Sequence, residues 1–140
     1  MNDTTHTHLQ SVSAMYEAFG RGDLPAILLH LSENVTWDVT DEPWSPHAAG
    51  VPWLLPRRGR EQVSEFFQIV GAWSYERFEV LEMLTSDTQV AAEIRLTATL
   101  PNGKRIDEEV IHLWTFGPDG KVIKLRRMLD TAANIEAARA

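Results

Sequence analysis

Hydrophobic positions in the first half of the chain recur with the spacing of helices. Between residues 5 and 20, apolar side chains return every three or four residues, which predicts an amphipathic helix. Asp23, a residue type favoured at helix N-caps, predicts a second, short helix directly after it. The same spacing over residues 60–72 predicts a third helix. We therefore expect three helices before residue 73.

One strand and one long loop interrupt this helical half. Residues 35–40 alternate apolar and polar side chains, which predicts a half-buried strand. Residues 41–58 contain four prolines, so neither a helix nor a central strand is expected there. Long loops inside compact domains are commonly functional. Because Trp44 lies in this segment, we expect the loop to fold over something apolar.

After residue 73 the period changes to two, which predicts strands. The predicted strands cover residues 78–84, 89–100, 104–116 and 121–129. Asn102-Gly103 and Asp119-Gly120 are strong hairpin signals. The last ten residues are predicted as a short helix or a frayed tail, with Asp130 as its cap. Helices followed by an antiparallel meander predict an α+β fold, in a single domain that spans residues 1–140.

Composition narrows the range of functions. The formal net charge of −7 argues against a nucleic-acid surface. The chain has no cysteine, no signal-peptide pattern at its start and no apolar run long enough for a membrane span, so a cytoplasmic protein without membrane contact is expected. Phosphate-loop, dinucleotide and common zinc motifs are missing. We therefore expect no cofactor and no metal.

His112 is the most informative polar residue, because it stands in an otherwise apolar strand. If both hairpins have two-residue turns, Glu93 lies opposite His112, and His112 lies opposite Arg127. A carboxylate raises the basicity of an imidazole, and an arginine can hold an anionic oxygen. This row of residues would suit general acid–base chemistry on a carbonyl or enol substrate.

A second register is equally compatible with the turns. Each turn also fits a type I turn followed by a bulge, with proline at the second position and glycine at the fourth. A one-residue change in both turns would place Ile111 beside Glu93 and Arg127, which would form an ion pair, and His112 would face the other way. A histidine in an apolar strand can also be an ordinary core residue. The residues alone leave these alternatives open.

Several short motifs, taken in order along the chain, resemble one known family. They are the Gly22–Asp23–Leu24 turn, Val35-x-Trp37, Gly59-Arg60 leading into Phe66-Phe67, and Trp114-x-Phe116 with Gly120-Lys121. Together they resemble the SnoaL-like group of the nuclear-transport-factor-2-like superfamily, which is related to ketosteroid isomerase. The resemblance implies a cone-shaped α+β barrel, in which a curved, mostly antiparallel sheet wraps around three helices and an internal cavity. It also implies a homodimer formed through the sheet.

The catalytic residues of ketosteroid isomerase transfer only in part. Its oxyanion aspartate falls on His112, and its oxyanion tyrosine falls on Met15, with Tyr16 one place away and expected to point elsewhere. Its general-base aspartate falls on Val39, with Asp38 adjacent but expected on the opposite strand face. With two of three groups missing, steroid isomerisation by that mechanism is not expected.

The related epoxide hydrolases give a further comparison. Their arginine and aspartate fall on Glu93 and Arg95, where the signs of the charges are reversed, so that chemistry does not transfer either. Both comparisons imply that Glu93, Arg95 and His112 line the cavity.

These inferences predict a small-molecule isomerase, cyclase or lyase that acts on a hydrophobic substrate. His112 would move a proton, Glu93 would orient it, and Arg127 or Arg95 would stabilise an enolate or carboxylate. The predicted walls of the substrate pocket are Trp37, Tyr16, Trp114, Val39, Met15, Leu125 and Trp44. The alternatives are a non-catalytic domain that binds a small hydrophobic molecule, and an assembly role for the sheet face.

Overall fold

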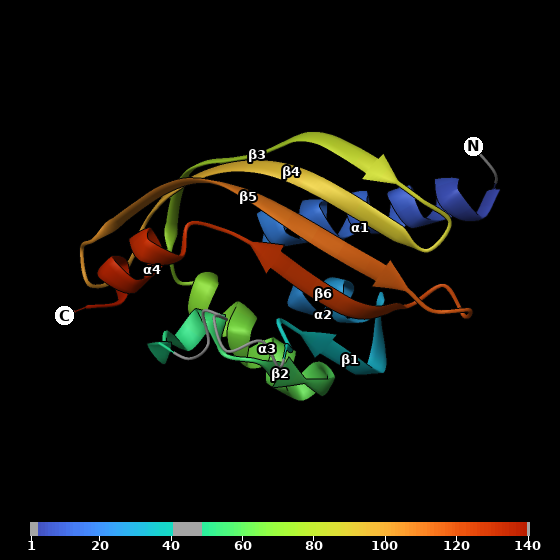
Figure 1. Ribbon diagram of the computed structural model, residues 1–140, viewed down its shortest axis with the longest axis horizontal. Helices are drawn as coiled ribbons and strands as arrows, with labels where there is room; N and C mark the ends of the chain where they lie inside the picture. The colour runs from blue at the N-terminus through green and yellow to red at the C-terminus, as the bar shows by residue number, and fades with distance from the viewer. Residues whose placement is uncertain (1–2, 41–48, 140) are drawn as a thin grey trace.

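The computed structural model describes residues 3–40 and 49–139, and all structural statements below concern these residues. Figure 1 shows long, arched strands with the first helix behind them and two further helices below. In chain order the elements are α1 (Asp3–Arg21), α2 (Leu24–Leu28), β1 (Leu31–Trp37), the 3-10 helix η2 (Pro52–Leu54), β2 (Arg57–Arg58), α3 (Gly59–Val70), β3 (Ser74–Thr85), β4 (Gln89–Thr99), β5 (Arg105–Phe116), β6 (Val122–Met128) and α4 (Thr131–Ala138). None of the helices described is long and apolar enough to cross a lipid bilayer.

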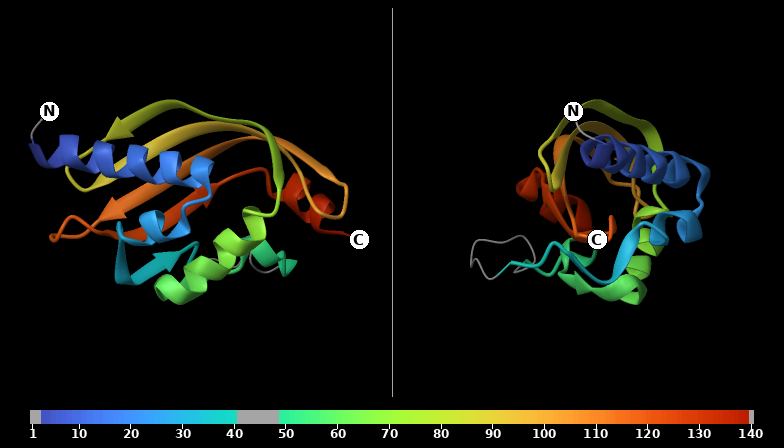
Figure 2. Two further views of the ribbon diagram at one scale, coloured as in Figure 1. Left: turned by 180° about the vertical axis from the view of Figure 1, so that it is seen from behind. Right: turned by 90° about the vertical axis from the view of Figure 1, so that its right-hand side faces the viewer.

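The strands form one curved, open sheet in the order β2-β1-β6-β5-β4-β3. The pairs are antiparallel except for β1 and β6, which run parallel. The end-on view in Figure 2 shows the sheet curling, with α1 and α3 on its open side. The predicted α+β fold, a cone-shaped curved sheet around helices from the first half of the chain, is confirmed.

The core lies between the concave face of the sheet and the helices. Helix α1 buries Val12, Met15 and Ala18, as its three- and four-residue spacing predicted. Every second side chain of β4 is turned to the same side, and Val90, Ala92 and Ile94 are completely buried there. Removing these apolar surfaces from water is the main force that holds helices and sheet together.

The first strand begins and ends earlier than predicted. β1 starts at Leu31 and stops at Trp37, whereas the prediction covered residues 35–40. It stops because Asp38 adopts a positive φ of 57°, which an extended strand does not allow. Val39 therefore follows the strand instead of belonging to it, and the expected strand face for Asp38 does not exist.

The hairpin between β4 and β5 takes the bulged register. The N–H of Gly103 donates to Leu100 O at 2.9 Å, and Gly103 has a φ of 86°, as a type I turn followed by a glycine bulge requires. Ala92 consequently pairs with His112, and Glu93 pairs with Ile111. The prediction that Glu93 lies opposite His112 is wrong. The observed register places the buried residues of β4 on the same face as those of β5, which the two-residue turn would have separated.

The hairpin between β5 and β6 has the same turn but a different outcome. The N–H of Gly120 donates to Gly117 O at 3.0 Å, and Gly120 has a φ of 81°. A second irregularity then shifts the register between Thr115 and Phe116. His112 therefore pairs with Arg127, as the two-residue turn predicted. An ion pair between Glu93 and Arg127, the other alternative, does not form.

Candidate functional site

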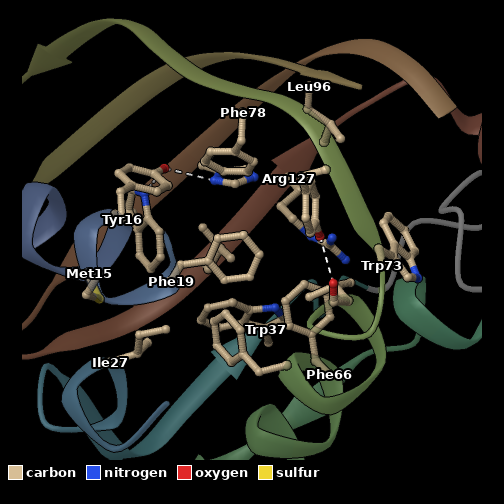
Figure 3. A pocket seen from close by; sticks show the side chains of 16 residues that line it. Met15, Tyr16, Phe19, Ile27, Trp37, Phe66, Trp73, Phe78, Leu96 and Arg127 are labelled. Carbon is tan, nitrogen blue, oxygen red and sulfur yellow. Dashed lines mark hydrogen bonds between the residues drawn. The ribbon is translucent and has the colours of Figure 1, made fainter. Parts of the chain in front are cut away.

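A pocket of about 80 Å³ lies between α1, α3 and the concave face of the sheet. Figure 3 shows aromatic side chains from both helices and from the sheet converging on it. The lining is almost entirely apolar and consists of Met15, Tyr16, Phe19, Ile27, Trp37, Phe66, Phe67, Val70, Trp73, Tyr75, Phe78, Leu96, His112, Trp114, Leu125 and Arg127. The few polar atoms in such a wall decide which ligand chemistry it can accept.

Three of these side chains form a hydrogen-bonded chain. Trp114 Nε1 donates to the Tyr16 hydroxyl oxygen at 3.0 Å. The Tyr16 hydroxyl lies 2.8 Å from Nδ1 of His112. The ring centroids of Tyr16 and His112 are 5.9 Å apart, so the two rings also pack against each other. Helix α1 and strand β5 meet at this contact.

Burial keeps both titratable members of the chain uncharged. Desolvation, with a smaller contribution from the positive charge of Arg127, lowers the pKa of His112 to about 3. Desolvation raises the pKa of Tyr16, against a smaller opposite effect of the hydrogen bond from Trp114. At neutral pH the pair is therefore a neutral imidazole next to a protonated phenol.

These states fix the direction of the hydrogen bonds. Because the Tyr16 oxygen already accepts from Trp114, we assign its proton to the bond with His112 Nδ1. The opposite tautomer would leave the Tyr16 proton without an acceptor among the described residues. In the assigned state His112 carries its proton on Nε2, which bonds to no described residue. The imidazole of His112 thus offers one N–H donor to whatever occupies the pocket.

Arg127, the one formally charged residue among the described residues that line the pocket, is held by Asp38. Its Nη2 lies 2.6 Å and its Nε 2.8 Å from Asp38 Oδ2, and its backbone N–H donates to Asp38 Oδ1 at 2.9 Å. Nη2 also donates to the backbone oxygen of Trp53, and the guanidinium lies 4.5 Å from the ring centre of Phe66. The two side chains are 8% and 13% exposed, so the pair is nearly buried. The charge of Arg127 is therefore already compensated within the protein.

A second buried polar cluster joins the first half of β5 to α4 and η2. Asn134 accepts a hydrogen bond from Trp53 Nε1 at 2.7 Å and donates to both carboxylate oxygens of Glu108, at 3.2 and 3.0 Å. Burial raises the pKa of Glu108, while the bonds from Asn134 and from the backbone of Asp130 act in the opposite direction. Sequence reasoning missed this cluster. Its signal was the alternation along β5, which places Glu108 on the same face as His112.

The structure brings most of the predicted site residues together. The predicted residues that line the pocket are Met15, Tyr16, Trp37, His112, Trp114, Leu125 and Arg127. Val39 is not part of the lining, because the strand ends before it. Trp44 lies outside the described residues. No cluster of three or more histidine, aspartate or glutamate side chains within the described ranges could hold a metal ion.

The predicted partners of His112 on β4 lie on the other face of the sheet. Glu93 pairs with Ile111, one position away from His112, so its side chain points to the outer face. Arg95 lies on that outer face as well and forms an ion pair with Asp107. Their predicted places in the cavity are therefore wrong, because the bulged turn moved every side chain of β5 by one position relative to β4.

Two other residues, Tyr16 and Asp38, contact His112 and Arg127 in place of Glu93. Tyr16 was predicted only as a wall of the pocket and not in the place of the isomerase's oxyanion tyrosine, but its hydroxyl reaches His112. The apolar stripe of an amphipathic helix is wide enough for neighbouring residues such as Met15 and Tyr16 to face the same pocket. Asp38 forms the ion pair with Arg127 that one of the two predicted registers assigned to Glu93.

Comparison with known proteins agrees with this architecture. An NTF2-like protein of unknown function from Burkholderia pseudomallei K96243 is 25% identical, with a TM-score of 0.77 over 96% of this chain and 98% of that chain. Bal32a, from a soil-derived mobile gene cassette, is 25% identical, with a TM-score of 0.78 over 98% and 100%. A proposed polyketide cyclase from Xanthomonas campestris pv. campestris shares the fold at 23% identity, with a TM-score of 0.71 over 98% and 100%.

The sequence comparison gives the family. A search of curated proteins found no match. The family model of the SnoaL-like domain matches residues 12–125, which include α3, both hairpin turns and every polar residue of the Trp114–Tyr16–His112 chain. The chain therefore belongs to the SnoaL-like domain family.

Proposed function

We propose that this protein is a small-molecule enzyme that activates the carbonyl group of an apolar substrate by hydrogen bonding. The observation that carries the proposal is the bond between Tyr16 and His112 Nδ1 inside an aromatic pocket. It leaves His112 Nε2–H directed to a ligand, and a neutral imidazole can polarise a carbonyl or an enol oxygen. The isomerase or cyclase chemistry expected from the sequence would begin with such a step.

The hydrogen-bonded chain supports His112 as a donor and not as a strong base. A base with a pKa of about 3 removes protons poorly at neutral pH. As negative charge develops on the substrate oxygen, the bond from His112 would strengthen, and Trp114 and Tyr16 would polarise in the same direction. In a pocket with so apolar a lining this stabilisation would be larger than in solution.

The charge balance of the pocket favours a neutral substrate. Arg127 is the formal cation of the wall, and Asp38 already neutralises it. A substrate carboxylate would have to break that buried ion pair or remain unpaired, and both are costly. We therefore expect ketones, esters or quinone-like molecules in preference to acids.

One observation favours a second candidate, a non-catalytic domain that binds the same ligands. Among the described residues that line the pocket there is no carboxylate, since Asp38 lies behind Arg127 and Glu93 faces the outside. Enolisation would then need water as the proton acceptor. A pure binder would hold the ligand oxygen without removing a proton.

Exchange of α-protons in D2O separates these two candidates. With 2-nonanone as the probe, the enzyme is expected to accelerate deuteration next to the carbonyl, measured by NMR, and to lower the carbonyl stretching frequency of the bound ketone. His112→Leu should abolish both effects, whereas His30→Leu, outside the pocket lining, should preserve them. A frequency shift without exchange would favour the binder. Neither effect in the wild-type protein would refute the proposal.

We also propose that the protein pairs with a second copy through the outer face of the sheet. The residues opposite to the pocket include Ile111 and Met128, which pair with each other and are 37% and 44% exposed, and the exposed Leu84. Such an apolar row on a solvent face is typical of interfaces. Ile111→Lys should convert a dimer into a monomer in analytical ultracentrifugation. A wild-type protein that sediments as a monomer would refute this pairing.

A further inference from the structure

A second hollow lies next to the pocket, at the end of α1. It has a volume of about 700 Å³ and is bounded by the last residues of α1, the start of α2, the end of α3 and the start of β3. It shares Tyr16, Phe19, Ile27, Phe67, Tyr75 and Phe78 with the lining of the inner pocket. The two spaces therefore border each other and share part of their walls.

Phe19 is the centre of this shared wall. Its ring centre lies 5.3 Å from that of Phe78, 5.5 Å from that of Tyr75 and 6.1 Å from that of Phe67. Figure 3 shows Phe19 projecting into the middle of the residues that surround the pocket. Its side chain is only partly buried, so it borders open space as well as the core.

The two spaces differ in size and in polarity. The inner pocket, at about 80 Å³, is smaller than an apolar cavity of roughly 150 Å³ that accommodates benzene. The outer hollow is larger and also has charged residues on its rim, namely Glu17 and the loose pair of Arg21 and Asp23, which are 3.5 Å apart. The charges of that pair cancel, so the rim has no uncompensated cation for an anionic group.

From this geometry we infer that the outer hollow is the second compartment of the ligand site, and that the ligand is an elongated neutral molecule with a carbonyl at one end. The carbonyl end enters the inner pocket beside His112, and the apolar body extends past Phe19 into the outer hollow. This inference rests on the proposed function, since it assumes that His112 holds the carbonyl oxygen. It adds the length of the ligand and the side from which it enters.

Gly20 offers a direct way to fill the outer compartment. It lies in α1 and lines the outer hollow but not the inner pocket. A Cβ atom built on Gly20 would meet nothing within 4 Å, so a side chain can begin there without a clash. Gln10 is exposed on the same helix and lines neither space, so Gln10→Phe is a matched control.

The experiment measures the affinity of 2-alkanones from 2-butanone to 2-nonanone by titration calorimetry. In the wild-type protein each added methylene should tighten binding by about fourfold, the change that corresponds to about 0.8 kcal/mol per buried CH2. Gly20→Phe should reduce this gradient to less than about 1.5-fold per methylene while 2-butanone remains within about twofold of its wild-type affinity. Gln10→Phe should keep the full gradient.

The outcomes separate this inference from the proposed function. If Gly20→Phe keeps the wild-type gradient, or weakens 2-butanone as much as 2-nonanone, the outer compartment is refuted while carbonyl binding at His112 stands. If the wild-type protein binds none of the ketones, both proposals fail. Should Gly20→Phe not fold, Gln68→Phe, at an exposed position on α3 that lines only the outer hollow, replaces it with the same expected result.

Discussion

Two of the buried polar clusters border the pocket, and they differ in how completely their polar atoms are bonded within the protein. The first is the neutral chain of Trp114, Tyr16 and His112, in which each bond leads towards the pocket and the last donor, Nε2–H, has no protein partner among the described residues. The second is the ion pair of Asp38 and Arg127, in which both carboxylate oxygens and the guanidinium are bonded within the protein. Both clusters border the same pocket, through His112 and Arg127.

The difference separates a site that is open to a ligand from a site that serves the fold. A donor that borders a pocket without a protein partner can bond to a ligand there, and we interpret the Nε2–H of His112 in this way. A buried ion pair that is complete can be nearly neutral for stability, but becomes very costly when one partner is lost. We call the Asp38–Arg127 pair the closed cluster and the Trp114–Tyr16–His112 chain the open cluster. Mutations in the closed cluster should mainly lower the stability of the fold, and mutations in the open cluster should mainly change ligand binding.

The largest effect is expected from Asp38→Asn. The change leaves the buried charge of Arg127 uncompensated, which should lower the free energy of unfolding by about 3–5 kcal/mol. Asparagine tolerates the positive φ of Asp38, so backbone strain should not contribute. Urea denaturation measures the loss.

Asp107→Asn is the matched control for this prediction. Asp107 also pairs with an arginine, Arg95, but its side chain is 45% exposed on the outer face. Exposed ion pairs contribute little, so this change should cost far less stability than Asp38→Asn. Equal losses of stability from the two substitutions would mean that burial does not make the Asp38–Arg127 pair more important for folding than an exposed ion pair.

The sequence predicts the helices and strands better than it predicts which residues of neighbouring strands lie opposite each other. The helices and strands followed from periodicity, because burial of an apolar face imposes a period that can be read residue by residue. The pairing of His112 with Arg127 was also predicted. The partner of His112 on β4 was not, because the choice between a two-residue turn and a bulged turn changes every pair in the hairpin.

The closed cluster was harder to predict than the open one. Asp38 meets Arg127 only because its backbone turns to positive φ where β1 ends, a local event that no hydrophobic pattern announces. Tyr16 lies on the predicted apolar stripe of α1, but which atom its hydroxyl would reach depends on how the helix crosses the sheet. Hydrophobic periodicity along one element predicts which of its faces is buried. A hydrogen bond between two elements depends also on how they are placed relative to each other.

An intermediate effect is expected from acidification, through His112. Its pKa is about 3 in the folded protein, against 6.5 for an ordinary histidine. Between these values the unfolded chain binds a proton that the folded protein does not bind, so stability falls as the pH decreases from 6.5 and is fully retained above it. The expected loss is about 2 kcal/mol between pH 6.5 and pH 5.

His112→Leu isolates this contribution. The variant lacks the imidazole, so its stability should not fall through this group between pH 6.5 and pH 5. Over this range the unfolding free energy of the wild-type protein should therefore decrease by about 2 kcal/mol relative to that of the variant. Glu108 contributes with the opposite sign, because its raised pKa favours proton uptake by the folded protein, and it is present in both proteins. Parallel pH profiles would show that the imidazole of His112 is not held neutral.

The smallest effect on stability, and the sharpest test of the contrast, is expected from Tyr16→Phe. The change removes one hydroxyl from the neutral chain and leaves His112 Nδ1 and Trp114 Nε1 without their partner, which should cost about 1–2 kcal/mol. It should nevertheless reduce the shift of the ketone carbonyl frequency, because it removes the bond from Tyr16 to Nδ1, which strengthens the Nε2–H donor and holds the His112 proton on Nε2.

Tyr75→Phe provides the control within the same pocket wall. The Tyr75 hydroxyl donates to Val70 O at 2.8 Å, so its loss should cost about as much stability as the loss of the Tyr16 hydroxyl. It is not bonded to His112, so the carbonyl shift should remain. If Tyr75→Phe reduced the shift as much as Tyr16→Phe, any hydroxyl of the wall would serve as well. The orientation of His112 would then not depend on the chain from Trp114, and the open cluster would have no function of its own.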